Sequence, residues 1–169
     1  MRTWHTSARC VLAVVLGACA NVPVGGPAPP SGGPTGSPAT IAADIIRYTN
    51  DARTRNGLPA FRTSSRLMEA ARIHAEQMAT HERDEHTISN ARYPTMQTRL
   101  AAVGYEYSRA AENVAWNQRS AQQVVTTWMN SSDHRRNILN SQLTEIGAAM
   151  ARSSKGEPYW IQVFGTPLR

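Results

Sequence analysis

Cysteine is scarce in this chain of 169 residues, occurring only at Cys10 and Cys19. Both lie near the amino terminus, so the chain after Cys19 has no disulfide bonds of its own and no thiolate ligands. A domain formed by these later residues must rely on its packed core for stability. Any metal that it binds must be held by His, Asp or Glu side chains.

Several catalytic patterns are also missing. The chain contains no Gly-x-Ser-x-Gly nucleophile elbow, no phosphate-binding glycine loop and no His-Glu-x-x-His pair. Ser131 and Ser132 lie near His134, but they suit a helix cap better than a nucleophile, and no third residue is evidently placed to orient the histidine. The sequence thus gives no motif that supports a function as a protease.

Basic residues are scattered and form no dense block. Loss of a signal containing Arg2 and Arg9 would leave 16 basic and 12 acidic residues, a net charge of +4. Aromatic residues do not alternate with the arginines, as they often do in nucleic-acid-binding surfaces. The charge therefore predicts a solvated basic surface and no nucleic-acid partner.

The first nineteen residues, 1–19, resemble a lipoprotein signal. A basic start is followed by the apolar residues 11–16, and Leu16-Gly17-Ala18-Cys19 resembles a lipobox whose cleavage leaves Cys19 as an acylated amino terminus. The apolar run is too short for a membrane-spanning helix, which needs roughly 20 residues. A plain secretory signal cut near a cysteine is the alternative. We expect lipidation at Cys19, which would anchor the protein to a membrane of the cell envelope, outside the cytoplasm.

Residues 20–39 are rich in Pro and Gly and have no hydrophobic pattern, so they are predicted to be a flexible linker. A domain is expected over residues 40–169. Apolar periodicity predicts helices over residues 40–56, 64–80 and 96–103 and after Ser120, with a break and a short further helix near Ser131. Strands are predicted over residues 112–116, 146–151 and 159–164, the last two forming a hairpin. Helices followed by a terminal hairpin predict an α+β fold.

One segment carries a recognisable pattern. It reads Trp128, Ser131, His134, Arg135, Ile138 and Leu139, a Trp-x-x-Ser-x-x-His-Arg-x-x-Ile-Leu string. Three further segments occur in the matching order, at residues 112–115, 144–147 and 159–165. Together they resemble the bacterial SCP-like form of the CAP superfamily over about residues 40–169. The resemblance implies an αβα sandwich of about four helices around a small antiparallel sheet.

The resemblance also implies a cleft that collects His86, Glu112 and His134. Many animal members have a second glutamate where this chain has Ser131, which weakens a four-residue acid–base mechanism. Imidazole and carboxylate groups are ordinary zinc ligands, so a His–Glu–His site for a divalent metal, Zn²⁺ being the natural candidate, is the implied chemistry. His74 is instead expected to be a buried core residue, because it lies on the apolar face of its helix.

Two functions remain open. The first is a membrane-anchored binding module whose cleft holds a divalent metal and whose ligand is a lipid, a glycan or an envelope protein. The second is a metal-assisted hydrolase in which Glu112 is the base and His86 and His134 are ligands. Glu112 and His134 are the candidate catalytic residues, and the missing second glutamate favours the binding module.

Overall fold

The computed structural model describes residues 34–168. The predicted signal, with its lipidation site at Cys19, and most of the predicted linker lie outside the described residues. Within the described part, the first helix begins at Pro38, so the last two residues assigned to the linker are helical.

Residues 34–168 contain five helices, in agreement with the sandwich of about four that the resemblance implies. They are α1 (Pro38–Arg55), α2 (Ser65–His81), α3 (Met96–Ala102), α4 (Ala121–Asn130) and α5 (Ser132–Ile138). The fifth is the short helix that the break at Ser131 predicts. Backbone nitrogens at the starts of α1, α2 and α4 donate to the side chains of Ser37, Ser64 and Ser120, which satisfies donors that a helix leaves free.

The described part of the chain has four strands, which form one sheet in the order β1-β3-β4-β2. They are β1 (Arg62–Thr63), β2 (Tyr107–Trp116), β3 (Glu145–Arg152) and β4 (Pro158–Pro167). β2, β4 and β3 pair antiparallel as expected, but β1 pairs parallel with β3, so the sheet is mixed. β1 was not predicted from the sequence, because two residues are too few to show an alternating pattern.

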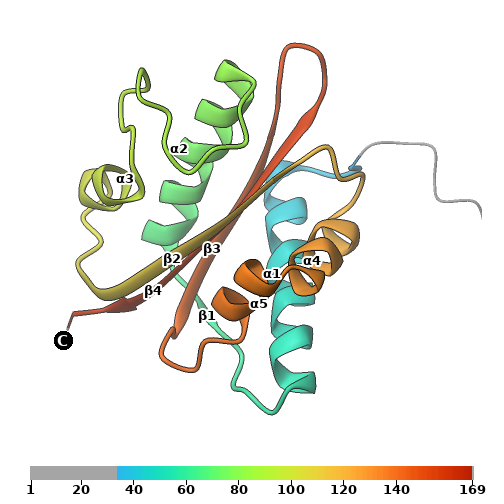
Figure 1. The fold of residues 1–169 in the computed structure, drawn as a ribbon, viewed down its shortest axis with the longest axis vertical. Coiled ribbons are helices and arrows are strands. Elements are labelled where there is room, and N and C mark those ends of the chain that lie inside the picture. Colours follow the sequence, from blue (N-terminus) through green and yellow to red (C-terminus); the bar gives the residue numbers. More distant parts are fainter. Residues whose placement is uncertain (1–33, 169) are drawn as a thin grey trace, which may run out of the picture.

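The molecule has three layers, with α1, α4 and α5 on one face of the sheet and α2 and α3 on the other (Figure 1). Trp128 and Phe164 are fully buried in the first interface, and Met78 and Ile161 in the second. The α+β prediction and the αβα sandwich are therefore confirmed. None of the helices in residues 34–168 is both long and apolar enough to span a bilayer.

Candidate functional site

Glu112 lies on β2 and forms the centre of the candidate site. Its strand is paired only with β4 in the sheet, and its side chain faces the layer of α3. The residue is only 8% exposed, so its carboxylate needs partners inside the protein. Two side chains supply them, Arg99 and His86.

Arg99 is the stronger partner, and it was not among the predicted site residues. It lies on α3 and is 1% exposed, and its Nη2 atom donates to both carboxylate oxygens of Glu112, at 3.1 Å and 2.9 Å. The same guanidinium also donates to the carbonyl oxygens of His86, Tyr93 and Pro94. A signal for it exists in the sequence, since Arg99 lies at helical spacing with Met96 and Leu100, and an arginine on an apolar helix face requires a buried acceptor.

His86 contacts the other side of the same carboxylate. Its Nδ1 atom lies 2.9 Å from Glu112 Oε1, while 56% of its side chain is exposed. An ionised carboxylate only accepts hydrogen bonds, so Nδ1 carries the proton and the neutral ring presents Nε2 as a free acceptor. The hydrogen bond to Glu112 raises the pKa of His86 above its usual value, against the opposing effect of burial.

Glu112 remains ionised in this setting. Burial alone would raise the pKa of its carboxyl group. The hydrogen bond from His86 and the positive charge of Arg99 outweigh burial and hold that pKa below its ordinary value. The carboxylate is thus a fixed negative charge that is already neutralised by a fixed positive one.

His134 approaches from the opposite layer, in the first turn of α5. Its carbonyl oxygen accepts a hydrogen bond from Asn113 Nδ2 at 3.2 Å, and Asn137 on the same helix donates to Asn113 Oδ1 at 2.9 Å. Burial lowers the pKa of His134, and the positive charge that His86 carries when it is protonated lowers it further. The Nδ1 atom of His134 is buried and has no hydrogen-bond partner in the described residues.

Packing holds the α5 turn rigidly in place. Trp128, in the last turn of α4, is fully buried and donates from Nε1 to the carbonyl oxygen of Val114. Ile138 is fully buried, and Leu139 is partly buried against the same core. At the carboxyl end of the turn, Arg53 donates to the carbonyl oxygens of Ile138 and Asn140, so α1 fixes the helix that carries His134.

The family assignment follows from the comparison with known proteins. The model of the cysteine-rich secretory protein family, abbreviated CAP, matches residues 46–164. That range covers most of the chain and includes all three predicted site residues. The chain belongs to the CAP family.

Curated and solved relatives agree with this assignment. YkwD of Bacillus subtilis is 30% identical over 133 residues, which are 77% of this chain and 50% of YkwD. An extracellular protein of Bacillus anthracis with an SCP domain has a TM-score of 0.67 and 24% identity, over 76% of this chain and 41% of that one. An outer surface protein of Borrelia burgdorferi has a TM-score of 0.68 and 18% identity, over 79% of this chain and 100% of that one. The chain thus spans about half the length of YkwD, and the likeness to the two solved structures is one of fold.

His74 lies behind the CAP cleft and is fully buried, as expected. Neither of its ring nitrogens has a hydrogen-bond partner in the described residues. Burial, helped by the charge of Arg99, lowers the pKa of His74 to about 4. This histidine is therefore neutral at physiological pH and belongs to the core behind Arg99 and Glu112.

The three predicted ligands do not form a ready-made metal centre. Within residues 34–168, no group of three or more His, Cys, Asp or Glu side chains is placed to hold a metal ion. Glu112 is the reason, because both of its oxygens are hydrogen-bonded to Arg99 and one of them also to His86. With both oxygens held in this way, Glu112 is not free to act as a ligand, and a metal site formed by His86, Glu112 and His134 stays a prediction.

Proposed function

We propose that this CAP domain is an extracytoplasmic binding module, held at a membrane through a lipid on Cys19. The family assignment supports the domain type, and the Bacillus anthracis and Borrelia burgdorferi relatives are described as an extracellular and an outer surface protein. A lipidated Cys19 followed by the Pro- and Gly-rich residues 20–37 would hold the cleft away from the bilayer.

The buried ion pair between Arg99 and Glu112 is the observation that carries the proposal. A general base works best when its pKa lies near the operating pH, yet the pKa of Glu112 is held below its ordinary value. Its oxygens are also committed to a guanidinium that is 1% exposed. The same pair that disfavours a hydrolase makes a rigid, prepositioned cleft wall, which suits binding.

In this proposal Glu112 positions His86 and is not itself a metal ligand. Carboxylates that accept from one ring nitrogen of a histidine fix its tautomer and orient the other nitrogen toward a ligand. His86 would then present Nε2, and His134 would contribute the second imidazole from α5. Two imidazoles would hold a divalent cation weakly, leaving its other positions for water or for a ligand bound in the cleft.

Calorimetric titration with Zn²⁺ tests this proposal. The expected result is weak binding that is lost in His86→Ala and in His134→Ala and is unchanged in the control His81→Ala, which alters a histidine at the end of α2 outside the cleft. Equal affinity for Zn²⁺ in the wild type and in His134→Ala would contradict the proposal that the cleft binds a cation through His134.

A panel of ester, amide and glycoside substrates tests the alternative. We expect no turnover by the zinc-loaded wild type above that of Glu112→Gln. Turnover that disappears in Glu112→Gln would instead establish the hydrolase in which Glu112 is the base.

A further inference from the structure

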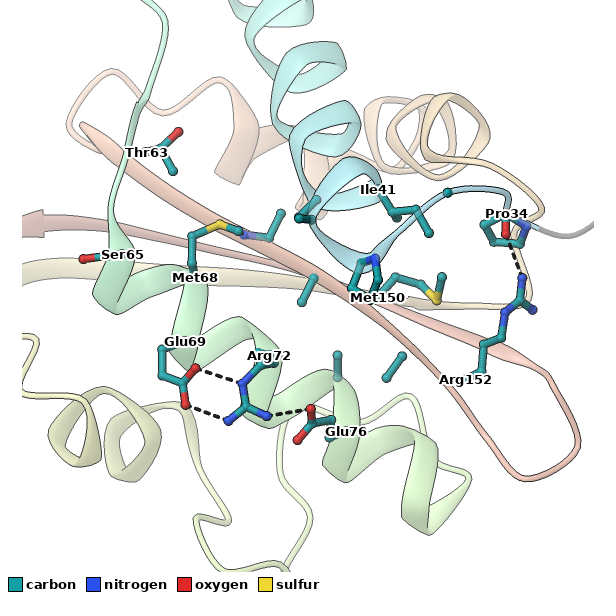
Figure 2. A pocket seen from close by; sticks show the side chains of 18 residues that line it. Pro34, Ile41, Thr63, Ser65, Met68, Glu69, Arg72, Glu76, Met150 and Arg152 are labelled. Atoms are coloured by element: carbon teal, nitrogen blue, oxygen red, sulfur yellow. Dashed lines mark hydrogen bonds and ion pairs between the residues drawn. The ribbon is translucent and has the colours of Figure 1, made fainter.

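A second feature of the molecule is a groove that runs along β3 between α1 and α2 (Figure 2). Its volume is about 920 Å³, and none of the residues that line it belongs to the cleft of His86 and Glu112. Its floor is made of small side chains on β3, such as Ala148, Ala149 and Ala151. The small floor leaves space above the strand that larger side chains would fill.

The groove exists because the sheet is incomplete at this edge. β1 pairs with β3 only at Glu145 and Ile146, after which the chain turns away into α2. Within the described residues, the remainder of β3 up to Arg152 has a neighbouring strand on one side only, namely β4. Beyond Ile146, the position next to β3 on its β1 side is therefore not occupied by a strand of the described residues.

Backbone polar groups of β3 face this unoccupied position. The carbonyl oxygens of Thr144 and Ile146 accept from the N–H groups of Arg62 and Ser64, both at 3.0 Å, so the carbonyl groups of these even-numbered residues point toward β1. Because the direction alternates along a strand, Ala148 and Met150 present theirs to the groove.

The hydrogen bond made by the N–H group of Ala148 confirms that direction. This N–H group donates to the sulfur atom of Met68 at 3.3 Å, and a thioether is a weak acceptor. The outward N–H and C=O groups of Met150 have no hydrogen bond to any other part of the chain that the structure describes. A strand edge with free donors and acceptors is a template for a further strand.

The two walls of the groove define the side chains that such a strand would carry. Met150 and Ile41 pack in the apolar layer of α1, whereas the α2 wall carries Arg72 between Glu69 and Glu76 (Figure 2). Two carboxylates around one guanidinium leave one net negative charge on that wall. Because alternate side chains of a strand point to opposite faces, the fitting peptide is apolar toward α1 and basic toward α2.

Arg152 supplies a charge of the other sign at one end of the groove. Its guanidinium donates to the carbonyl oxygens of Pro34 and Gly156, and within residues 34–168 it has no carboxylate partner. A peptide whose carboxylate lies at this end would complement it. The charge pattern therefore distinguishes an amphipathic peptide from a purely apolar ligand.

We propose that the free edge of β3 binds an extended peptide segment of a partner protein as an added strand. The segment alternates apolar and basic residues and has an acidic group near Arg152. The main-chain hydrogen bonds to Ala148 and Met150 provide the attachment, and the two walls provide the selectivity. This surface shares no residue with the histidine cleft, so peptide binding here can be tested independently of metal binding there.

The probe for a test is a short synthetic peptide that alternates valine and lysine and ends in a glutamate with a free carboxylate. Amide hydrogen exchange is measured by NMR on the isotope-labelled full chain with and without this peptide. We expect exchange at Met150 to slow several-fold on binding, because its N–H group acquires a partner. Ala149 is an internal control, since its N–H group already faces β4.

Two controls separate strand pairing from simple filling of the groove. Ala39→Trp, at an exposed position that lines the groove, should abolish the protection, whereas Ala101→Trp, at an exposed position on α3, should not. A peptide N-methylated at alternate residues, so that it cannot donate to the β3 edge, should fail to bind.

Two outcomes would overturn the proposal. If the N-methylated peptide binds as well as its parent, the groove recognises apolar matter such as an acyl chain and does not add a strand. If saturating peptide leaves the exchange of Met150 and the resonance of Ala148 unchanged, this edge does not bind such a peptide.

Discussion

At the scale of single residues, the site is defined by one buried arginine. Arg99 determines what Glu112 can do, because it neutralises the carboxylate and fixes both of its oxygens. Burying two charges is costly, and breaking such a pair costs more than replacing it with neutral groups, because the remaining charge is left without its partner. The pair therefore favours a fixed wall over a group that must gain and lose protons.

Replacing Arg99 by methionine tests this role. Arg99→Met keeps most of the side-chain length but leaves Glu112 buried beside only one partner, so we expect a loss of roughly 3 kcal/mol in the free energy of unfolding. The double variant Arg99→Met/Glu112→Gln removes both charges and should recover part of that loss. Urea denaturation of the three proteins measures the effect, and near-identical midpoints would show that the pair contributes little.

His74 gives a prediction for pH. Its pKa is about 4 in the folded protein against 6.5 for a free histidine. Between these two pH values, the unfolded chain therefore binds a proton at His74 that the folded chain does not bind. The stability linked to His74 is therefore complete above pH 6.5 and falls as the pH decreases from 6.5 toward 4, by roughly 3 kcal/mol at most. Arg99 and Glu112 are the charged groups that act on this ring.

The measurement is the denaturation midpoint across that pH range. His74→Leu should lose less stability than the wild type between neutral pH and the lower end, while the control His81→Leu should follow the wild type. Parallel curves for wild type and His74→Leu would contradict the assignment of His74 as a buried neutral residue.

At the scale of elements, the close packing of α2 on β3 depends on a glycine in the segment 144–147 that supported the family resemblance. A Cβ atom at Gly147 would lie 2.1 Å from the backbone carbonyl carbon of Leu67, which cannot move without shifting the helix. This explains why the third residue of β3 is a glycine. It also places Leu67, at the start of α2, directly against the sheet.

Gly147→Ala should accordingly be among the most damaging single-methyl additions in the protein. We expect a loss of about 3 kcal/mol, at the upper end for an overpacked core, because helix and strand must separate. Gly156→Ala is the control: its φ is +81° and its Cβ would meet no atom within 4 Å, so it tests backbone strain alone. A smaller loss in melting temperature for Gly147→Ala than for Gly156→Ala would contradict this packing argument.

The elements themselves were largely predictable because their signals are local. Ser64 and Ser120 marked the starts of α2 and α4, and the position of Trp128 before Ser131 predicted the break between α4 and α5. Arg99 was missed because its partner Glu112 lies 13 residues away on another element. The apolar face of α3 indicates that Arg99 needs a buried acceptor, but no local pattern shows that this acceptor is Glu112. The metal site of His86, Glu112 and His134 stays a prediction.

At the scale of the whole molecule, we propose a domain with two binding sites, the histidine cleft and the groove along β3, that is attached to a membrane by a lipid. Cys19 lies outside the described residues, so anchoring is tested directly on the protein. Cys19→Ala should move the protein from the membrane fraction to a soluble or uncleaved form, since no other residue of the chain fits the acylated position. Cys10→Ala is the control and should leave fractionation unchanged. Membrane-bound Cys19→Ala, together with a wild-type amino terminus that carries no acyl group by mass spectrometry, would rule out the anchor.

The central claim is that Glu112 positions His86, so that two imidazoles and no carboxylate face the ligand. Long-range nitrogen–proton NMR correlations of the histidine rings, recorded on the isotope-labelled protein with and without Zn²⁺, test it most directly. We predict a proton on Nδ1 of His86 before addition, and a zinc-dependent shift of its Nε2 and of one nitrogen of His134, with the Glu112 carboxyl carbon unchanged. A zinc-dependent shift of that carbon, or ring nitrogens that do not respond, would contradict the account.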